Sequence, residues 1–246
     1  MSKHNIKITN KQRVRVSIVI PTLNEAMGIR ETINRIPMKE LRDAGYDVEV
    51  VVVDGGSTDG TDRIAMELGA LVVYEPRKGY GRAFKTGFSV ASGDIIVTLD
   101  GDASYPPEVI PHLLKIMNEV DADFITTQRI PQSGAMSFIN KIGNYVLTLT
   151  TRILFRVKLK DSQSGMWVVK REILKDILPQ GGDGMEFSEI IKIKAFLCGK
   201  KVYEYPIPYN KRLGKPKLKR VRDGLRNLVY LFILYVRSRM GRRCYG

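Results

Sequence analysis

Short apolar runs alternate with helically spaced apolar residues over the first half of the chain. Runs rich in valine and isoleucine predict buried strands over 14–21, 48–53, 70–74, 94–99 and 124–127. Between these runs, apolar residues recur at helical spacing, as with Ile29, Ile33 and Ile36 ahead of Pro37. Near-continuous apolar strands that alternate with helices are typical of a mostly parallel sheet covered on both faces. The pattern predicts one α/β domain over 14–219, preceded by a basic tail over 1–13.

Two later segments are longer and more basic. Residues 137–158 carry an apolar helical stripe with basic side chains around it, and residues 228–236 are nine apolar residues flanked by arginines. No uninterrupted apolar run in the sequence reaches the roughly 18–20 residues needed to span a bilayer. An apolar helix with basic flanks can instead lie among lipid headgroups. We therefore predict a membrane-facing helix over 137–158 and a membrane-associating helix over 220–246, although packing on the domain or a dimer interface would leave the same pattern.

Composition and charge narrow the class of protein. The 246 residues are 43% hydrophobic and 27% charged, which is ordinary for a globular protein. Cys198 and Cys244 are too few for a disulfide framework or a zinc ribbon. The net charge of +14 is concentrated in residues 200–246, which contain 14 basic and two acidic residues. This charge predicts an anionic partner: a nucleic acid, an acidic membrane surface or a phosphorylated substrate.

Polar clusters follow three of the predicted strands. They span Pro21–Glu25, Asp54–Gly60 and Asp100–Asp102. Ligands of parallel α/β sheets bind at the carboxyl ends of strands, so we expect the three clusters to share one crevice. Asp100 and Asp102 flank a glycine, and carboxylate pairs suit Mg²⁺ or Mn²⁺. The alternative is that the two aspartates only cap a turn.

Taken together, these clusters resemble the motifs of glycosyltransferase family 2, which has the GT-A fold. The motifs appear in one order over about residues 14 to 220: Pro21–Glu25, Val53–Thr61, Lys78-Gly79, Asp100–Pro107 and Asp161–Gly165. Within the family they look most like the dolichyl-phosphate mannose synthase group and its prokaryotic polyprenyl-phosphate relatives.

The resemblance implies a nucleotide pocket whose residues come from the first three motifs. In this sequence they are Pro21, Asn24, Glu25, Asp54, Gly56, Lys78 and Gly79. Glu25 is then near the ribose, and Asp54 contacts the base. The resemblance leaves the choice between a UDP-linked and a GDP-linked sugar open.

It also implies a catalytic set around the donor diphosphate. Asp100 and Asp102 would bind the metal that bridges the two phosphates. Arg129 matches an arginine that faces the phosphates, and Arg212 matches one on a loop that closes over the donor.

Two classes of acceptor are possible, and they differ in whether the transfer reaction needs a general base. A sugar hydroxyl needs a carboxylate to take its proton, and Glu186 is the candidate. A lipid phosphate is already ionised and needs cations instead. The chain offers several cations for that role: Arg129, Lys141, Lys211, Arg212, Lys215 and Lys217.

The leading hypothesis is an inverting, metal-dependent glycosyltransferase that uses Mg²⁺ or Mn²⁺. It moves a hexose from a UDP- or GDP-sugar to dolichyl or polyprenyl phosphate, as a peripheral protein at the cytoplasmic face of an anionic membrane. The first alternative is a family-2 transferase that acts on a sugar hydroxyl with Glu186 as base. A basic nucleic-acid-binding module is the remaining alternative; the basic tail lacks interleaved stacking aromatics, so we expect no nucleic-acid partner.

Overall fold

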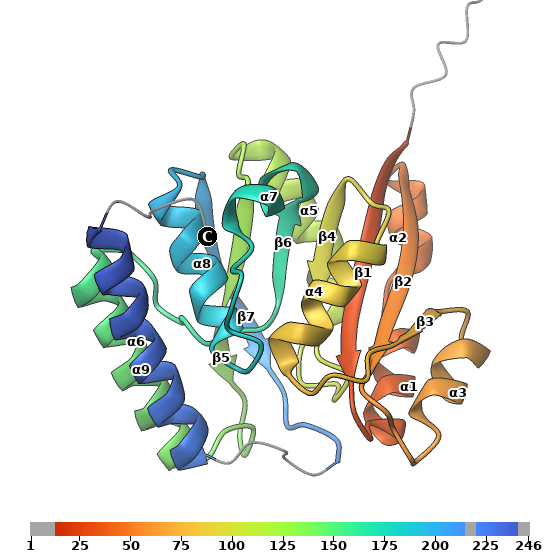
Figure 1. Cartoon of the computed structure of the whole chain (residues 1–246). Coiled ribbons are helices and arrows are strands. Elements are labelled where there is room, and N and C mark those ends of the chain that lie inside the picture. The colour runs from red at the N-terminus through yellow and green to blue at the C-terminus, as the bar shows by residue number, and fades with distance from the viewer. Residues whose placement is uncertain (1–12, 215–219, 241–246) are drawn as a thin grey trace, which may run out of the picture.

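The computed structural model describes residues 13–214 and 220–240, and these form a seven-stranded sheet with helices on both faces (Figure 1). The strand order is β3-β2-β1-β4-β6-β5-β7. The strands are β1 (Val14–Thr22), β2 (Tyr46–Asp54), β3 (Leu71–Tyr74), β4 (Ile95–Thr98), β5 (Phe124–Pro131), β6 (Trp167–Lys170) and β7 (Val202–Tyr209). Only β6 runs antiparallel to its neighbours, so the predicted mostly parallel α/β class is confirmed.

The sheet separates two apolar cores, because alternate side chains of each strand point to opposite faces. Val16, Ile18 and Ile20 of β1 join one core, and Val19 joins the other. The first core is covered by α1 (Ala26–Asn34), α2 (Met38–Asp43), α3 (Thr61–Glu67), the 3-10 turn η1 (Pro107–Val109) and α5 (Ile110–Glu119). The second is covered by α4 (Tyr80–Val90), η2 (Arg171–Ile173), α7 (Leu174–Ile177) and α8 (Phe187–Leu197).

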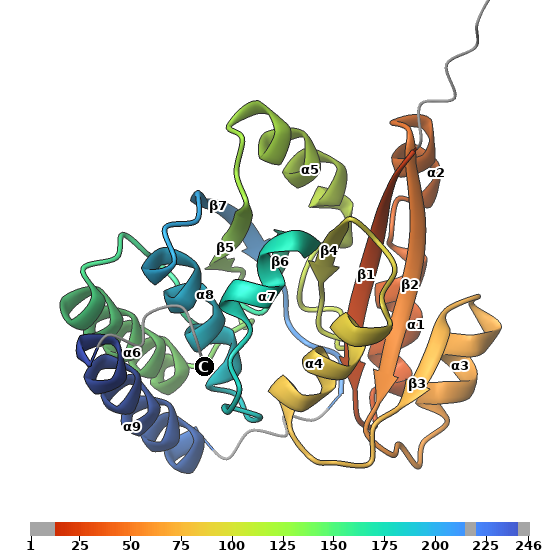
Figure 2. The same cartoon turned by 45° about the horizontal axis from the view of Figure 1, so that its top comes forward.

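The two predicted amphipathic helices pack side by side at the β7 end of the sheet. They are α6 (Phe138–Phe155) and α9 (Arg220–Arg239), and Figures 1 and 2 both show them as a parallel pair outside α8. Leu147 of α6, Leu231 of α9 and Ile193 of α8 form a third apolar cluster that attaches the pair to the domain. Among the described residues, no helix is both long and apolar enough to cross a membrane.

Candidate active site

The predicted clusters meet at the carboxyl end of the parallel strands. The loop after β1 and the loop after β2 are joined directly, since the Ser57 hydroxyl accepts a hydrogen bond from Asn24 N at 2.8 Å and the Asn24 side chain accepts one from Thr58 N at 2.8 Å. Glu25 N donates to the Thr61 hydroxyl at 2.8 Å. Residues far apart in sequence therefore form one rim, which begins at Pro21 near the end of β1.

Asp54 organises its own loop. Its Oδ1 accepts hydrogen bonds from the backbone N–H groups of Gly56 and Ser57, at 2.9 and 2.8 Å, and its Oδ2 accepts one from the Ser57 hydroxyl at 2.5 Å. Gly56 has φ +90°, a left-handed conformation that favours glycine. The Asp54 side chain is buried, so its direct structural effect is to fix the shape of the turn beside β3.

Lys78 and Gly79 form the next part of the rim, immediately before α4. A β-carbon on Gly79 would lie 2.2 Å from the carbonyl oxygen of Asp183, so only glycine fits. The Lys78 side chain is exposed. The close approach of Gly79 brings the loop before α8 against the start of α4.

Asp100 and Asp102 lie just beyond β4. Asp102 Oδ1 accepts hydrogen bonds from Ser104, from its N–H at 3.0 Å and from its hydroxyl at 2.5 Å. Burial, and then the charge of Asp102, raise the pKa of Asp100 to about 7. This is the electrostatic situation that a cation between the two carboxylates would relieve, and carboxylate oxygens are ligands that Mg²⁺ and Mn²⁺ prefer. Among residues 13–214 and 220–240, no cluster of three or more His, Cys, Asp or Glu side chains is arranged to hold a metal ion.

Arg212 lies over this carboxylate site. Its Nη2 is 3.0 Å from Glu25 Oε1 and 3.3 Å from Asp102 Oδ2. The Arg212 loop is anchored by Leu213 N, which donates to the carbonyl of Asp102 at 2.8 Å. The loop after β7 thus brings a cation to two carboxylates of the predicted donor site.

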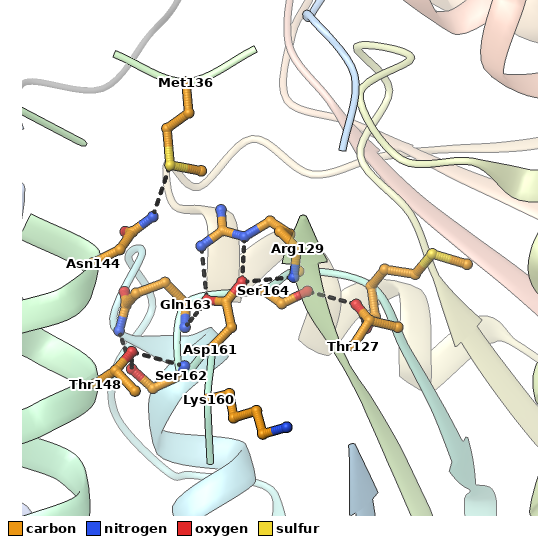
Figure 3. A network of polar contacts seen from close by, with 12 residues as sticks. Thr127, Arg129, Met136, Asn144, Thr148, Lys160, Asp161, Ser162, Gln163 and Ser164 are labelled. Carbon is orange, nitrogen blue, oxygen red and sulfur yellow. Dashed lines mark hydrogen bonds and ion pairs between the residues drawn. The ribbon is translucent and has the colours of Figure 1, made fainter. Parts of the chain in front are cut away.

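Arg129, near the end of β5, is held by a buried carboxylate. Asp161 Oδ2 accepts hydrogen bonds from Arg129 N at 3.1 Å and Nε at 2.7 Å, and Oδ1 accepts one from Nη2 at 2.9 Å (Figure 3). Burial acts to raise the pKa of Asp161, but the Arg129 charge and hydrogen bonds outweigh it and hold that pKa low. The guanidinium also lies over the Tyr209 ring, at 5.3 Å from its centroid. These contacts fix Arg129 in one orientation.

Glu186 is 1% exposed and is the N-cap residue immediately before α8. Its Oε1 accepts hydrogen bonds from Gly184 N at 3.0 Å and from Arg226 Nη2 of α9 at 3.1 Å. The geometry matches that of an anchor for a basic residue, which the sequence allowed as an alternative to a base.

Of the other predicted cations, Lys141 and Lys211 are exposed, and Lys215 and Lys217 lie outside the described residues.

Tyr80 and Asp161 are further candidate site residues, and no role could be assigned to either from the sequence. The Tyr80 hydroxyl donates a hydrogen bond to Asp100 Oδ1 at 2.7 Å. A β-carbon on Gly165 would lie 2.4 Å from that hydroxyl, so the loop after Asp161 must have glycine there. Tyr80 directly follows Lys78-Gly79, and this adjacency was the available signal.

Comparison with known proteins agrees with this geometry. Residues 17–178 match the family described as glycosyl transferase family 2. The chain is 31% identical over 204 residues to a dolichyl-phosphate hexose transferase of Haloferax volcanii, covering 82% of this chain and 86% of that one. It is 33% identical over 222 residues to the low-salt glycan biosynthesis hexosyltransferase Agl6 of the same organism, covering 89% of this chain but only 53% of Agl6.

The fold is also found in a solved structure. Glucosyl-3-phosphoglycerate synthase of Mycobacterium tuberculosis, in complex with Mn²⁺, UDP and glucosyl-3-phosphoglycerate, superposes with a TM-score of 0.67 at 23% identity. The match covers 94% of this chain and 80% of that one. It shows that the α/β architecture is that of the GT-A glycosyltransferases.

Proposed function

The chain belongs to glycosyltransferase family 2, and we propose that it transfers a hexose from a nucleotide sugar to a polyprenyl phosphate at a membrane surface. The observation that carries the proposal is the position of Arg129. This fixed cation lies at the end of β5, and six residues separate that strand from α6, a helix with an exposed apolar stripe. A phosphate headgroup would meet Arg129, and its hydrocarbon chain would remain beside α6.

The helix pair supports a lipid acceptor. Large apolar side chains are exposed at helical spacing along both helices, where water would be an unfavourable neighbour. On α6 they are Phe138, Ile142, Tyr145, Leu149 and Ile153, and on α9 they are Leu225, Val229, Phe232, Ile233 and Val236. Exposed basic side chains adjoin them: Lys141, Arg152, Arg156, Lys158, Arg237 and Arg239. This arrangement fits an anionic membrane surface better than it fits water.

The pairing of Glu186 supports a phosphate rather than a hydroxyl acceptor. A general base must reach the proton that it removes. Glu186 is buried, and the Arg226 guanidinium contacts its carboxylate. An ionised phosphate needs no such base, so we assign Glu186 to anchoring α9.

Asp100 and Asp102 would hold Mg²⁺ or Mn²⁺, with donor phosphates and water completing the ligands. The bound cation would neutralise charge that develops on the departing nucleoside diphosphate. Arg212 would contribute to the same neutralisation from the loop after β7. The nucleoside would be bound by the predicted pocket residues that lie on the rim between Pro21 and Gly79. Direct attack of the acceptor phosphate on the anomeric carbon of the donor sugar would invert the configuration of that carbon.

The test is incubation with labelled UDP- and GDP-hexoses and either polyprenyl phosphate or the matching polyprenol. We expect label to enter the organic phase with the phosphate and not with the alcohol, and the anomeric carbon of the product to be inverted. Label transferred to a water-soluble glycan, with none in the lipid, would overturn the proposal in favour of the hydroxyl acceptor.

A further inference from the structure

The loop from Asp161 to Ser164 is held by several elements that meet between the helix pair and the sheet (Figure 3). Lys192 of α8 is completely buried, and its Nζ donates to the carbonyls of Ser162 at 2.9 Å and Ser164 at 2.6 Å. Ser162 N donates to the Thr148 hydroxyl of α6 at 3.1 Å. These buried hydrogen bonds hold the loop in one conformation. The loss of any one of them would alter that conformation.

One of those partners comes from the C-terminal helix. Asn227 of α9 is 5% exposed, and its Nδ2 donates a hydrogen bond to Gln163 Oε1 at 2.9 Å. Its own Oδ1 accepts no hydrogen bond from the described residues. A buried amide oxygen without a hydrogen bond lowers the free energy of unfolding. An apolar residue at position 227 would therefore attach α9 with a smaller loss of stability. The asparagine instead makes one directional hydrogen bond, to the side chain of Gln163.

Gln163 links Asn227 to the ion pair of Arg129 and Asp161. Its Nε2 donates to the Ser162 hydroxyl at 2.9 Å, and its backbone N–H donates to Asp161 Oδ1 at 3.1 Å. The same carboxylate oxygen accepts the Nη2 hydrogen bond of Arg129. Asn227 is therefore connected to Arg129 through Gln163 and Asp161, by contiguous hydrogen bonds within a buried loop.

We propose that Asn227 and Gln163 are positioning residues for Arg129, so that the seating of α9 sets the geometry of the acceptor-phosphate site. This inference rests on the proposed function, in which Arg129 meets the acceptor phosphate. Neither residue touches substrate. Their effect is exerted through the Asp161 carboxylate, which needs both the loop conformation and the Gln163 N–H to keep its orientation.

The test uses Asn227→Ala and Asn227→Leu in the whole chain. Neither alanine nor leucine has a polar side-chain atom, so both variants remove the contact with Gln163 while the exposed stripe of α9 stays intact. Ser238→Ala is the matched control, because Ser238 is also buried on α9 but its hydroxyl bonds within the helix, to the carbonyl of Tyr235 at 2.7 Å. We expect kcat/KM for polyprenyl phosphate in vesicles to fall about tenfold in the Asn227 variants, as for loss of one buried hydrogen bond. Donor affinity and vesicle binding should equal those of Ser238→Ala.

A second readout is independent of turnover. The Arg129 Nε–H resonance, assigned by its absence in Arg129→Lys, should shift in Asn227→Ala and in Gln163→Ala and stay in place in Ser238→Ala. The double variant should shift no further than either single variant, because both lie on one connection. An unmoved resonance, or acceptor kinetics equal to those of Ser238→Ala, would overturn the positioning role. If the wild-type protein labels no lipid, the proposed function fails instead, and the resonance still decides whether α9 positions Arg129.

Discussion

Arg129 and Asp161 form a bidentate ion pair whose side chains are both nine-tenths buried, with Nε 2.7 Å from Oδ2. Removing one partner of a buried pair leaves an uncompensated charge, which costs about 3–5 kcal/mol. We expect Asp161→Asn to lower the free energy of unfolding by a large fraction of that amount, as measured by urea denaturation. Replacing both partners, by Arg129→Met with Asp161→Leu, should recover much of the stability but no activity. Equal stability of the single and double variants would contradict this account.

Asp102→Asn tests the metal site without relying on turnover. The loss of one charged ligand should weaken Mn²⁺ binding about tenfold or more, measured by electron paramagnetic resonance of free Mn²⁺. Donor binding should weaken with it, while circular dichroism stays unchanged. Asp47→Asn is the control, since Asp47 pairs with Arg15 near the start of β2, at the opposite end of the sheet. Equal Mn²⁺ binding in the two variants would show that the cation is held elsewhere.

Glu186→Gln separates the two acceptor chemistries. The amide can still accept hydrogen bonds from Gly184 and Arg226, so α9 should stay attached. With a phosphate acceptor we expect kcat to fall less than about tenfold, because a general base is worth about 10²–10⁴-fold. Steady-state kinetics with saturating donor measures this. A loss in the higher range, at unchanged donor affinity, would favour a hydroxyl acceptor and Glu186 as its base.

Lys192 gives the stability a pH dependence. Burial lowers its pKa to about 7, against the opposing charges of Asp161 and Glu189, whereas the unfolded chain has the ordinary value of 10.5. A group whose folded pKa is depressed contributes stability at high pH, and this is lost as the pH falls towards the folded pKa. The free energy of unfolding should therefore rise between pH 7 and pH 10, with a slope of at most about 1.4 kcal/mol per pH unit. Urea denaturation of Lys192→Met should lack this component, and an equal slope in both proteins would contradict the assignment.

The sheet could be predicted from the sequence only as far as its apolar runs extend. The five predicted strands are all present. Four of them are largely buried aliphatic runs, and β3 is an edge strand whose residues are exposed or half-buried. The edge strand β7 was missed, since Pro206 and Pro208 interrupt its sequence. Proline is tolerated at an edge, where one side of the strand needs no ladder partner. The helix α8 was missed because Glu189, Lys192 and Lys194 resemble surface residues but are buried.

The positions of the candidate site residues could be predicted from the sequence better than the residues with which they pair. The aspartates after β4 and the arginine near the end of β5 follow from position along a parallel sheet. The pairing of Arg129 with Asp161, or of Glu186 with Arg226, depends on how loops and helices pack across 32 and 40 residues. No local spacing encodes such contacts.

Exposed apolar residues of the helix pair give the last prediction, which concerns membrane binding. Phe232 of α9 is 51% exposed, and Met66 of α3 has a similar exposed fraction, 53%, on a helix of the first core. Transferring the exposed part of a phenylalanine into lipid is worth about 1–1.5 kcal/mol, or roughly tenfold in partition coefficient. Phe232→Ser should therefore weaken co-sedimentation with anionic vesicles about tenfold, and Met66→Ser should leave it unchanged. Ile153→Ser on α6 should behave like Phe232→Ser. High salt should weaken binding of the wild-type protein without abolishing it, because the arginine contribution is screened and the apolar contribution is not. If Phe232→Ser binds vesicles like the wild type but shifts a dimer to a monomer in light scattering, the stripe is an interface between two copies of the chain and not a membrane surface.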